Sequence, residues 1–270
     1  MKKILNLLKD NKAFQALLNK QNIVVNSQNA EALLIASAFL TLKKNMLIIK
    51  SNQYEANLLY KQVSQMIEDV LYFPVDESYR IESLAASGEL LGQRLSTMYE
   101  LSKEKPHLLI SHGHSVMRYV PSKDVFKKNC MTLKVGDHID VYELQRFLIQ
   151  AGYMHTTRVD QPFYFSKRGG VIDVFSMQYD HPIRIDFFDD EIDYLKFFDE
   201  KTQRTIEKVN EIEIIPATDL LYLDQEVGLV ITKIKDSFEE QYQKMDDLFK
   251  DDFEEKIMIQ RIVQITMNRF

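Results

Sequence analysis

The alternation of hydrophobic and polar positions divides the chain into three stretches. In the first, short β-branched runs alternate with segments whose apolar residues recur at helical spacing. The predicted strands are at 23–25, 46–49, 70–73 and 108–110. The predicted helices are at 3–19, 28–43, 53–68 and 82–103. This alternation is typical of an α/β domain with a parallel sheet, which we predict for residues 1–125.

The second stretch begins after Pro121, where the pattern changes. A strand-like run at 131–135 precedes one clear helix at 140–151, for which Asp140 can serve as the N-cap. Several short strands with alternating polarity follow, separated by turn residues. This mixture of elements predicts a separate α+β domain at 126–217.

In the third stretch, after Pro216, the apolar spacing becomes helical again. Heptad-like spacing extends over 227–249 and 253–267. We therefore predict that residues 218–270 are the helical start of a further domain.

The composition and the net charge argue against several classes of protein. The 270 residues are 45% hydrophobic and carry a net charge of −6, which opposes a purely electrostatic hold on nucleic acid. The one cysteine, Cys130, excludes an internal disulfide and fits a reducing cytosol. The longest mostly apolar stretch, 32–42, is far shorter than the roughly 20 residues of a membrane span. We expect a soluble, cytoplasmic protein with no membrane partner.

The strand-like run at 183–188 places an aromatic residue among polar ones. Side chains alternate between the two faces of a strand, so Arg184, Asp186 and Phe188 share one face and the apolar residues take the other. Upstream, Arg168 precedes a pair of glycines that fits a tight hairpin connection. Arginine and aromatic residues on an exposed face are typical of docking surfaces. The alternative is that Phe188 is covered by a neighbouring element.

The residues of a nucleotide-binding site are missing from the segment where they are expected. The first strand of a nucleotide-binding sheet runs into a glycine-rich loop and a lysine, which together hold phosphates. Here the loop contains Asn26, Ser27, Gln28 and Asn29, followed by Glu31, with no glycine and with an acid where a cation is needed. We predict that this segment neither binds nor hydrolyses ATP.

Other candidate sites carry weaker signals. His112 and His114 are two residues apart and have no third ligand nearby in sequence, so a structural role is favoured over metal binding. The acidic residues at 186–193 lack the spacing of a calcium loop, and we interpret the segment between Phe188 and Ile192 as a solvated β-turn. No serine or cysteine lies in a recognisable nucleophile motif. We predict no catalytic residue, no metal site and no cofactor site in this chain.

A series of short motifs occurs in a specific order along nearly the whole chain. The motifs are GQRL at 92–95, LKVG at 133–136, AGY at 151–153, RGGVIDVF at 168–175, RIDFFDDEI at 184–192, QRT at 203–205 and IPA at 215–217. In this order they resemble the N-terminal, UvrB-homologous module of the bacterial transcription-repair coupling factor family (Mfd).

The resemblance implies both an architecture and a role. The architecture is a degenerate P-loop or helicase-like parallel-sheet fold, domains 1a and 1b, interrupted by the UvrA-binding domain 2. The role is the recruitment of UvrA to stalled RNA polymerase in transcription-coupled nucleotide excision repair. In that family other parts of the parent protein bind RNA polymerase and duplex DNA, and a C-terminal translocase binds ATP and Mg²⁺. The chain is therefore expected to be a catalytically silent fragment or truncated form.

The resemblance also assigns site residues. The UvrA contacts of the family fall on Arg168, Arg184 and Phe188, the residues that strand alternation and the hairpin single out. Asp186 shares their face and is expected either to contact UvrA or to orient Arg184.

Two alternative functions stay open from the sequence. A UvrB-type damage-binding protein would need a working phosphate loop and a long aromatic β-hairpin, and both are missing here. A purely autoinhibitory structural module, which keeps its parent protein in a resting state, is the other alternative. A nucleotide-binding assay separates the first alternative from the coupling-factor reading.

Overall fold

The chain folds into two compact units. The computed structural model describes residues 8, 10–74, 88–117, 120–221 and 227–243. Contacts within the chain separate unit 1, Met1–Val120, from unit 2, Pro121–Phe270. None of the helices in the described ranges has the length and apolar character of a membrane span.

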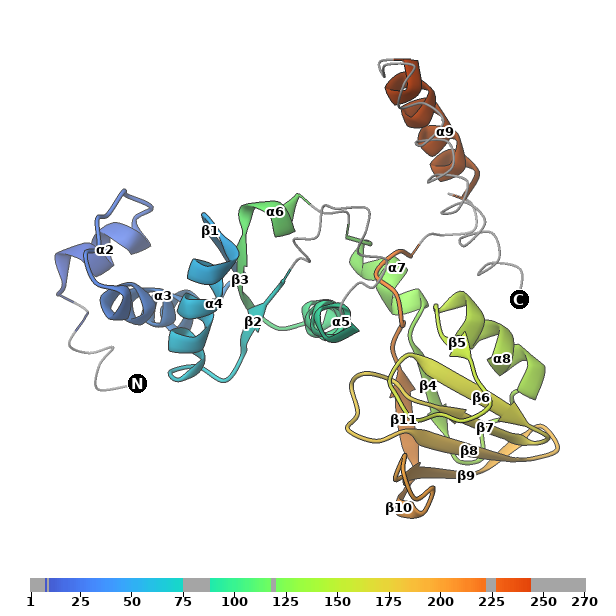
Figure 1. Cartoon of the computed structure of the whole chain (residues 1–270). Helices are drawn as coiled ribbons and strands as arrows, with labels where there is room; N and C mark the ends of the chain where they lie inside the picture. The colour runs from blue at the N-terminus through green and yellow to red at the C-terminus, as the bar shows by residue number, and fades with distance from the viewer. Residues whose placement is uncertain (1–7, 9, 75–87, 118–119, 222–226, 244–270) are drawn as a thin grey trace. The chain divides into compact units, whose positions relative to one another are not determined.

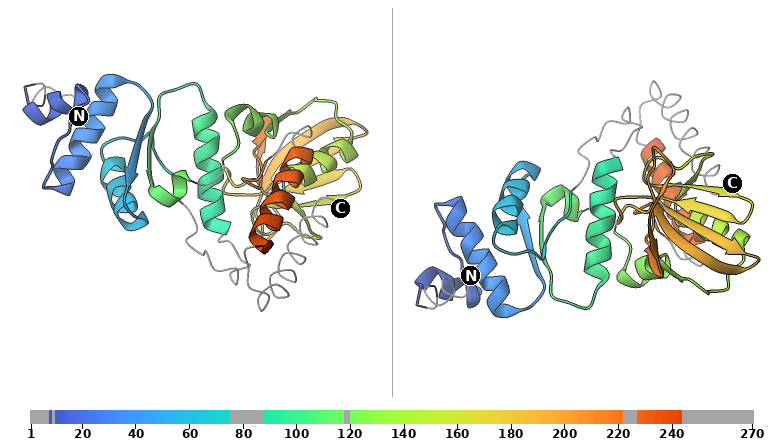
Figure 2. Two further views of the ribbon diagram at one scale, coloured as in Figure 1. Left: turned by 90° about the horizontal axis from the view of Figure 1, so that it is seen from above. Right: turned by 90° about the horizontal axis from the view of Figure 1, so that it is seen from below.

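Unit 1 is a three-stranded parallel sheet with helices on both sides. The strands are β1 (Met46–Lys50), β2 (Val70–Tyr72) and β3 (Leu108–His112), in the order β1-β3-β2. The helices are α2 (Lys12–Leu18), α3 (Gln28–Leu42), α4 (Gln53–Ser64), α5 (Gly88–Ser102) and α6 (Gly113–Val116). In Figures 1 and 2, α4 and α5 lie on opposite sides of this sheet. The parallel α/β arrangement predicted for this stretch is confirmed.

One of the four predicted strands of unit 1 is wrong. Residues 21–27 have no regular secondary structure. Ile23 and Val25 instead pack against a small cluster around Phe14 on α2, while Val24 between them is 89% exposed. The β-branched run that predicted a strand is thus partly buried at alternate positions by contacts with the cluster around Phe14, without a neighbouring strand. The other three strands are confirmed.

Unit 2 is built on a six-stranded, mostly antiparallel sheet. Its order is β10-β9-β8-β7-β6-β5, and β4 and β11 form a separate antiparallel pair. The strands are β4 (Met131–Lys134), β5 (Met154–His155), β6 (Tyr164–Arg168), β7 (Val171–Val174), β8 (Ile183–Phe188), β9 (Glu191–Phe198), β10 (Thr205–Val209) and β11 (Glu211–Ile214). The helices are α7 (Lys123–Lys128), α8 (Val141–Gln150) and α9 (Val227–Gln243).

Helix α8 covers one face of the large sheet and begins at the predicted N-cap. The Asp140 carboxylate accepts hydrogen bonds from the backbone N–H groups of Tyr142 (2.8 Å) and Glu143 (3.0 Å). The inner side of the helix contributes Leu144 and Leu148 to the main core of the unit, which also contains buried residues of β7, β8 and β9. This packing leaves the other face of the sheet with polar side chains along β7 and β8.

Helix α9 lies within the third, helical stretch of the sequence. The second predicted helix of that stretch, 253–267, lies outside the described residues, as do the first residues of the helices predicted at 3–19 and 82–103. The contacts define one boundary, between residues 120 and 121, and the division into three domains stays a prediction.

Candidate functional site

The hairpin between β6 and β7 fixes the position of Arg168. Arg168 pairs with Val171 across the hairpin, and Gly169 at the turn has a φ of +59°, in the left-handed region that glycine favours. A side chain at Gly170 would be crowded for a different reason, since a Cβ there would lie 3.3 Å from the backbone oxygen of Phe187. The predicted hairpin is confirmed, although only the first glycine adopts a positive φ.

Strand β8 shows the predicted alternation of faces. Ile183 and Ile185 are fully buried, and Phe187 packs against the main core. Phe188, at the end of the strand, is 76% exposed, so no element of the described chain covers it. The exposed ring therefore lies on the side of the sheet that faces away from α8.

The strand register identifies the other residues of that side, because directly paired residues of neighbouring strands point to the same face. We call this side the polar face. Its members are Ser166, Arg168, Val171, Asp173, Arg184, Asp186, Phe188, Glu191, Tyr194, Lys196 and Lys208. All four residues that the sequence predicts for the site lie on it.

Arg184 is held rigidly on the polar face. Its Nε and Nη2 donate hydrogen bonds to the two carboxylate oxygens of Asp173, at 2.7 and 2.8 Å, and Nη2 also donates to Gln203 Oε1 at 3.2 Å. The guanidinium lies 4.5 Å from the centre of the Phe198 ring. The hydrogen bonds that Arg184 donates to the Asp173 carboxylate raise the pKa of Arg184, so the group remains charged. Such a fixed planar cation loses little entropy on binding.

The hydrogen bonds that orient Arg184 go to Asp173 and not to Asp186. Asp173 has that role, because it pairs directly with Arg184 across β7 and β8. Asp186 instead forms an ion pair with Lys196 of β9. In the sequence, Asp173 is visible as an acid between apolar residues of the run at 171–174. Its pairing with Arg184 follows only from the register of β7 and β8.

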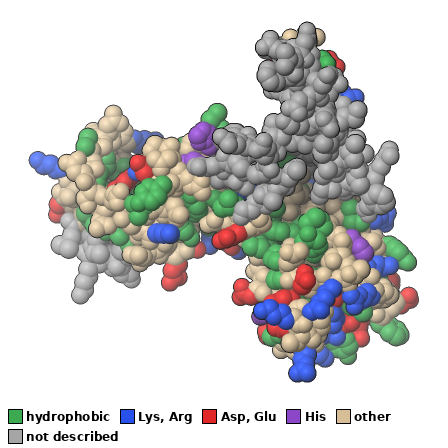
Figure 3. Space-filling model, in the orientation of Figure 1, with side chains coloured by type: hydrophobic (Ala, Val, Ile, Leu, Met, Phe, Trp, Pro, Cys, Tyr) green, Lys and Arg blue, Asp and Glu red, His purple; other side chains and the backbone are tan. Residues whose placement is uncertain are grey.

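Arg168 keeps an uncompensated positive charge. Its Nη2 donates to the backbone oxygen of Thr157, and the described part of the chain gives it no carboxylate partner. On the face of unit 2 drawn in Figure 3, Lys and Arg side chains are interspersed with Asp and Glu side chains. The strand register places basic and acidic side chains together on the polar face, so it offers separate charges of both signs around the exposed Phe188 ring and no broad stripe of one sign.

The acidic residues after Phe188 form a turn between β8 and β9. Asp189 has a φ of +59°, and Asp190 accepts from His138 Nδ1 at 3.1 Å, which raises the pKa of His138. The interpretation of this segment as a turn is confirmed. Within the described ranges, no group of three or more His, Cys, Asp or Glu side chains could hold a metal ion.

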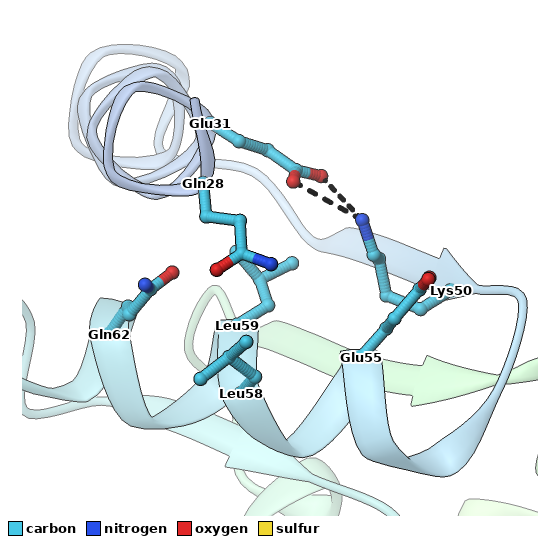
Figure 4. A pocket seen from close by; sticks show the side chains of 7 residues that line it. All are labelled: Gln28, Glu31, Lys50, Glu55, Leu58, Leu59 and Gln62. Carbon is cyan, nitrogen blue, oxygen red and sulfur yellow. Dashed lines mark hydrogen bonds and ion pairs between the residues drawn. The ribbon is translucent and has the colours of Figure 1, made fainter. Parts of the chain in front are cut away.

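The predicted defective loop leads into a small pocket in unit 1. Ser27 is the N-cap of α3 but makes no capping hydrogen bond with its side chain, and Gln28 begins the helix. The pocket has a volume of about 110 Å³ and lies between α3, β1 and α4. Figure 4 shows its main polar contact: Lys50 Nζ donates to both oxygens of Glu31, at 3.0 and 3.2 Å. Glu55 adds a second carboxylate, so the pocket repels anions.

His112 has a structural partner. Its side chain is fully buried, and its Nδ1 lies 2.8 Å from the hydroxyl oxygen of Ser115. The centre of its ring is 6.2 Å from that of His114. These contacts fit the structural role that the sequence favours for this pair.

The strands that carry the polar face lie within a region of the chain that matches a known protein family. Residues 131–220, which contain β4 to β11, match the family described as UvrB interaction domain. A transcription-repair-coupling factor of Staphylococcus haemolyticus is 31% identical over 259 residues, which are 93% of this chain and 22% of that protein. Those of Staphylococcus epidermidis and Staphylococcus aureus are 30% identical over 259 and 256 residues.

The chain spans about a fifth of the length of these curated relatives. The match nevertheless extends over both units, and the family match covers the sheet that bears the polar face. The chain is therefore homologous to the N-terminal region of the transcription-repair-coupling factors, and it contains a UvrB interaction domain.

Proposed function

We propose that the chain recruits a UvrA-type protein through the polar face of unit 2, as a step in transcription-coupled nucleotide excision repair. Arg168, Arg184 and Phe188 make the contacts. The observation that carries the proposal is the 76% exposed ring of Phe188 on the same face as a rigidly held arginine, within a UvrB interaction domain.

The exposed ring supplies a large share of the binding energy in this proposal. A phenylalanine side chain buries about 150–250 Å² in an interface, and apolar burial contributes about 25 cal/mol per Å². Three quarters of such an area gives an upper limit of about 3–5 kcal/mol. Association and ordering costs reduce it, so truncation of Phe188 should cost about 1–3 kcal/mol, the range of interface hot spots.

Unit 1 acts in this proposal as a catalytically silent, degenerate helicase-like domain. The Glu31–Lys50 ion pair supports this, because Glu31 in the first turn of α3 already neutralises Lys50 of β1 and a second acid, Glu55, also lines the pocket. Phosphate binding would need the opposite balance of charge. RNA polymerase, duplex DNA, ATP and Mg²⁺ would be bound by the parts of the longer relatives that this chain does not span.

Isothermal titration of the chain into purified UvrA tests the proposal. Arg168→Ala, Arg184→Ala and Phe188→Ala should each weaken binding about 5- to 150-fold, because a hot-spot truncation costs about 1–3 kcal/mol. Tyr142→Ala is the control, since Tyr142 is 64% exposed but belongs to α8 on the other side of the sheet.

Arg168→Ala and Phe188→Ala must keep the melting temperature of the wild type for the comparison to be valid. Arg184→Ala leaves the buried Asp173 carboxylate without its partner, so it is expected to lower the melting temperature and must be shown to remain folded at the temperature of the titration. If Arg168→Ala and Arg184→Ala bind UvrA like the wild type while Phe188→Ala unfolds unit 2, the patch is structural and the docking proposal is wrong.

A further inference from the structure

The polar face continues past the three proposed contact residues onto β9 and β10. Tyr194 is directly opposite Asp186, and Lys208 is opposite Lys196, which is itself opposite Arg184. Neighbouring strands are about 4.8 Å apart, so Lys208 lies roughly 10 Å across the sheet from Arg184. Tyr194 and Lys208 thus border the surface that carries Arg184.

The ring of Tyr194 is exposed and lies close to two lysines. Lys208 Nζ lies 4.3 Å from the ring centre and Lys196 Nζ lies 5.6 Å from it. The side chain is 44% exposed. A tyrosine side chain has only two rotatable side-chain bonds, so it offers a large contact area at a low cost in conformational entropy. This is why tyrosine is enriched in binding hot spots.

Lys208 carries a charge that the described chain does not neutralise. Like charges directly opposite each other on a sheet are unfavourable, and Lys196 and Lys208 form such a pair. Asp186 neutralises Lys196, whereas Lys208 has no carboxylate partner among the described residues. The ring of Tyr194 provides a favourable cation–π contact for Lys208. The arrangement leaves a positive charge beside an exposed ring on β10.

The area required by a specific complex also favours this extension. A standard interface covers about 800 Å² on each partner, a patch about 28 Å across. Arg168 on β6 and Phe188 on β8 are only two strands apart, about 10 Å. From β6 to β10 the polar face spans four strand spacings, about 19 Å. A partner seated on the three proposed residues would therefore reach β9 and β10.

We propose that Tyr194 and Lys208 belong to the docking surface, where Lys208 pairs with a carboxylate of the partner and Tyr194 packs against apolar groups beside it. This inference rests on the proposed docking of a UvrA-type protein. The matching region of that partner is a patch with acidic and apolar side chains, since complementary charge fixes the register of an interface.

Calorimetric titration of the full chain into purified UvrA tests this extension. Tyr194→Ala should weaken binding about tenfold, as expected for a moderate hot spot. Lys208→Glu should weaken it more than Lys208→Ala, because reversal adds repulsion from the partner's carboxylate. Binding by Lys208→Ala should also depend less on salt concentration than binding by the wild type, because one screened ion pair is lost.

Tyr142 and Lys167 provide a matched control. Lys167 Nζ lies 3.7 Å from the centre of the Tyr142 ring, which repeats the contact between Lys208 and Tyr194. Lys167 pairs with the buried Ile172, so it points to the α8 side of the sheet. Tyr142→Ala and Lys167→Glu should leave the affinity for UvrA within about twofold of the wild type.

The outcomes separate this inference from the proposed function. If Phe188→Ala weakens binding while Tyr194→Ala and Lys208→Glu bind like the wild type, the extension is wrong and the proposed docking stands. If none of the three variants weakens binding, both are wrong. If Tyr194→Ala unfolds unit 2, the exposed Lys208 decides the question alone, since its replacement by glutamate disturbs no core contact.

Discussion

The substitution Asp173→Asn tests how Arg184 is held on the polar face. Asp173 is 6% exposed and accepts two hydrogen bonds from Arg184. Asparagine keeps the size of the side chain but removes its charge and turns one acceptor into a donor that faces the guanidinium. Breaking a buried ion pair costs about 3–5 kcal/mol, whereas an exposed pair contributes about 0–1 kcal/mol. The Arg184 side chain is 25% exposed and can reach water, so we expect a cost of about 2 kcal/mol.

Scanning calorimetry of the full chain measures this cost. The matched domain at residues 131–220 has about 90 residues, and for a domain of that size 2 kcal/mol corresponds to a decrease in melting temperature of about 8–16 °C. Asp186→Asn is the matched control, because it removes an acid from the same face that is less buried, with 23% of its side chain exposed against 8% for Asp173; it should cost about 1 kcal/mol or less. Equal decreases for the two variants, or an unchanged transition in Asp173→Asn, would refute the assignment of Asp173 as the anchor of Arg184.

Gly152→Ala should destabilise unit 2 by about 1–3 kcal/mol more than Gly136→Ala, measured by calorimetry. Both glycines have a φ near +90°, at +91° and +89°, but only at Gly152 would a Cβ lie 2.7 Å from Thr218 Cγ2; equal effects would contradict this. Burial raises the pKa of Cys130 to about 12, so at pH 8 its thiol should react with a disulfide reagent more than about 100-fold more slowly than in the chain unfolded in urea. Reaction at the unfolded rate would show that the thiol is accessible and ionisable. Calorimetry should detect no ATP binding by the chain at millimolar concentration, and saturable binding would revive the UvrB-type alternative.

Features with a local period or a local signal could be predicted from the sequence. The alternation in β8 has a period of two, and the glycines after Arg168 mark a hairpin whatever packs around it. Asp140 begins a helix because its carboxylate satisfies free N–H groups of the first turn. Each of these features depends on residues within a few positions of one another.

Features set by contacts between distant segments could not be predicted in this way. Ile23 and Val25 have the pattern of a strand, but they are covered by helices, so no ladder forms. The anchor of Arg184 is 11 residues away, on another strand, and its identity depends on the register. The contact of Tyr194 with Lys208 likewise depends on the pairing of β9 with β10. Strand pairing, more than composition, decides which polar residues meet.

Hydrogen exchange of the chain with and without UvrA tests the central claim most directly. Amides in turns exchange fast unless a partner covers them, whereas amides within strands are already protected. The account predicts that UvrA slows exchange at Gly169 and Gly170 and in the turn at Asp189 and Asp190, and leaves the amides of unit 1 unchanged. Protection confined to Met1–Val120, or unchanged exchange in both turns at saturating UvrA, would contradict the claim that the polar face of unit 2 is the docking surface.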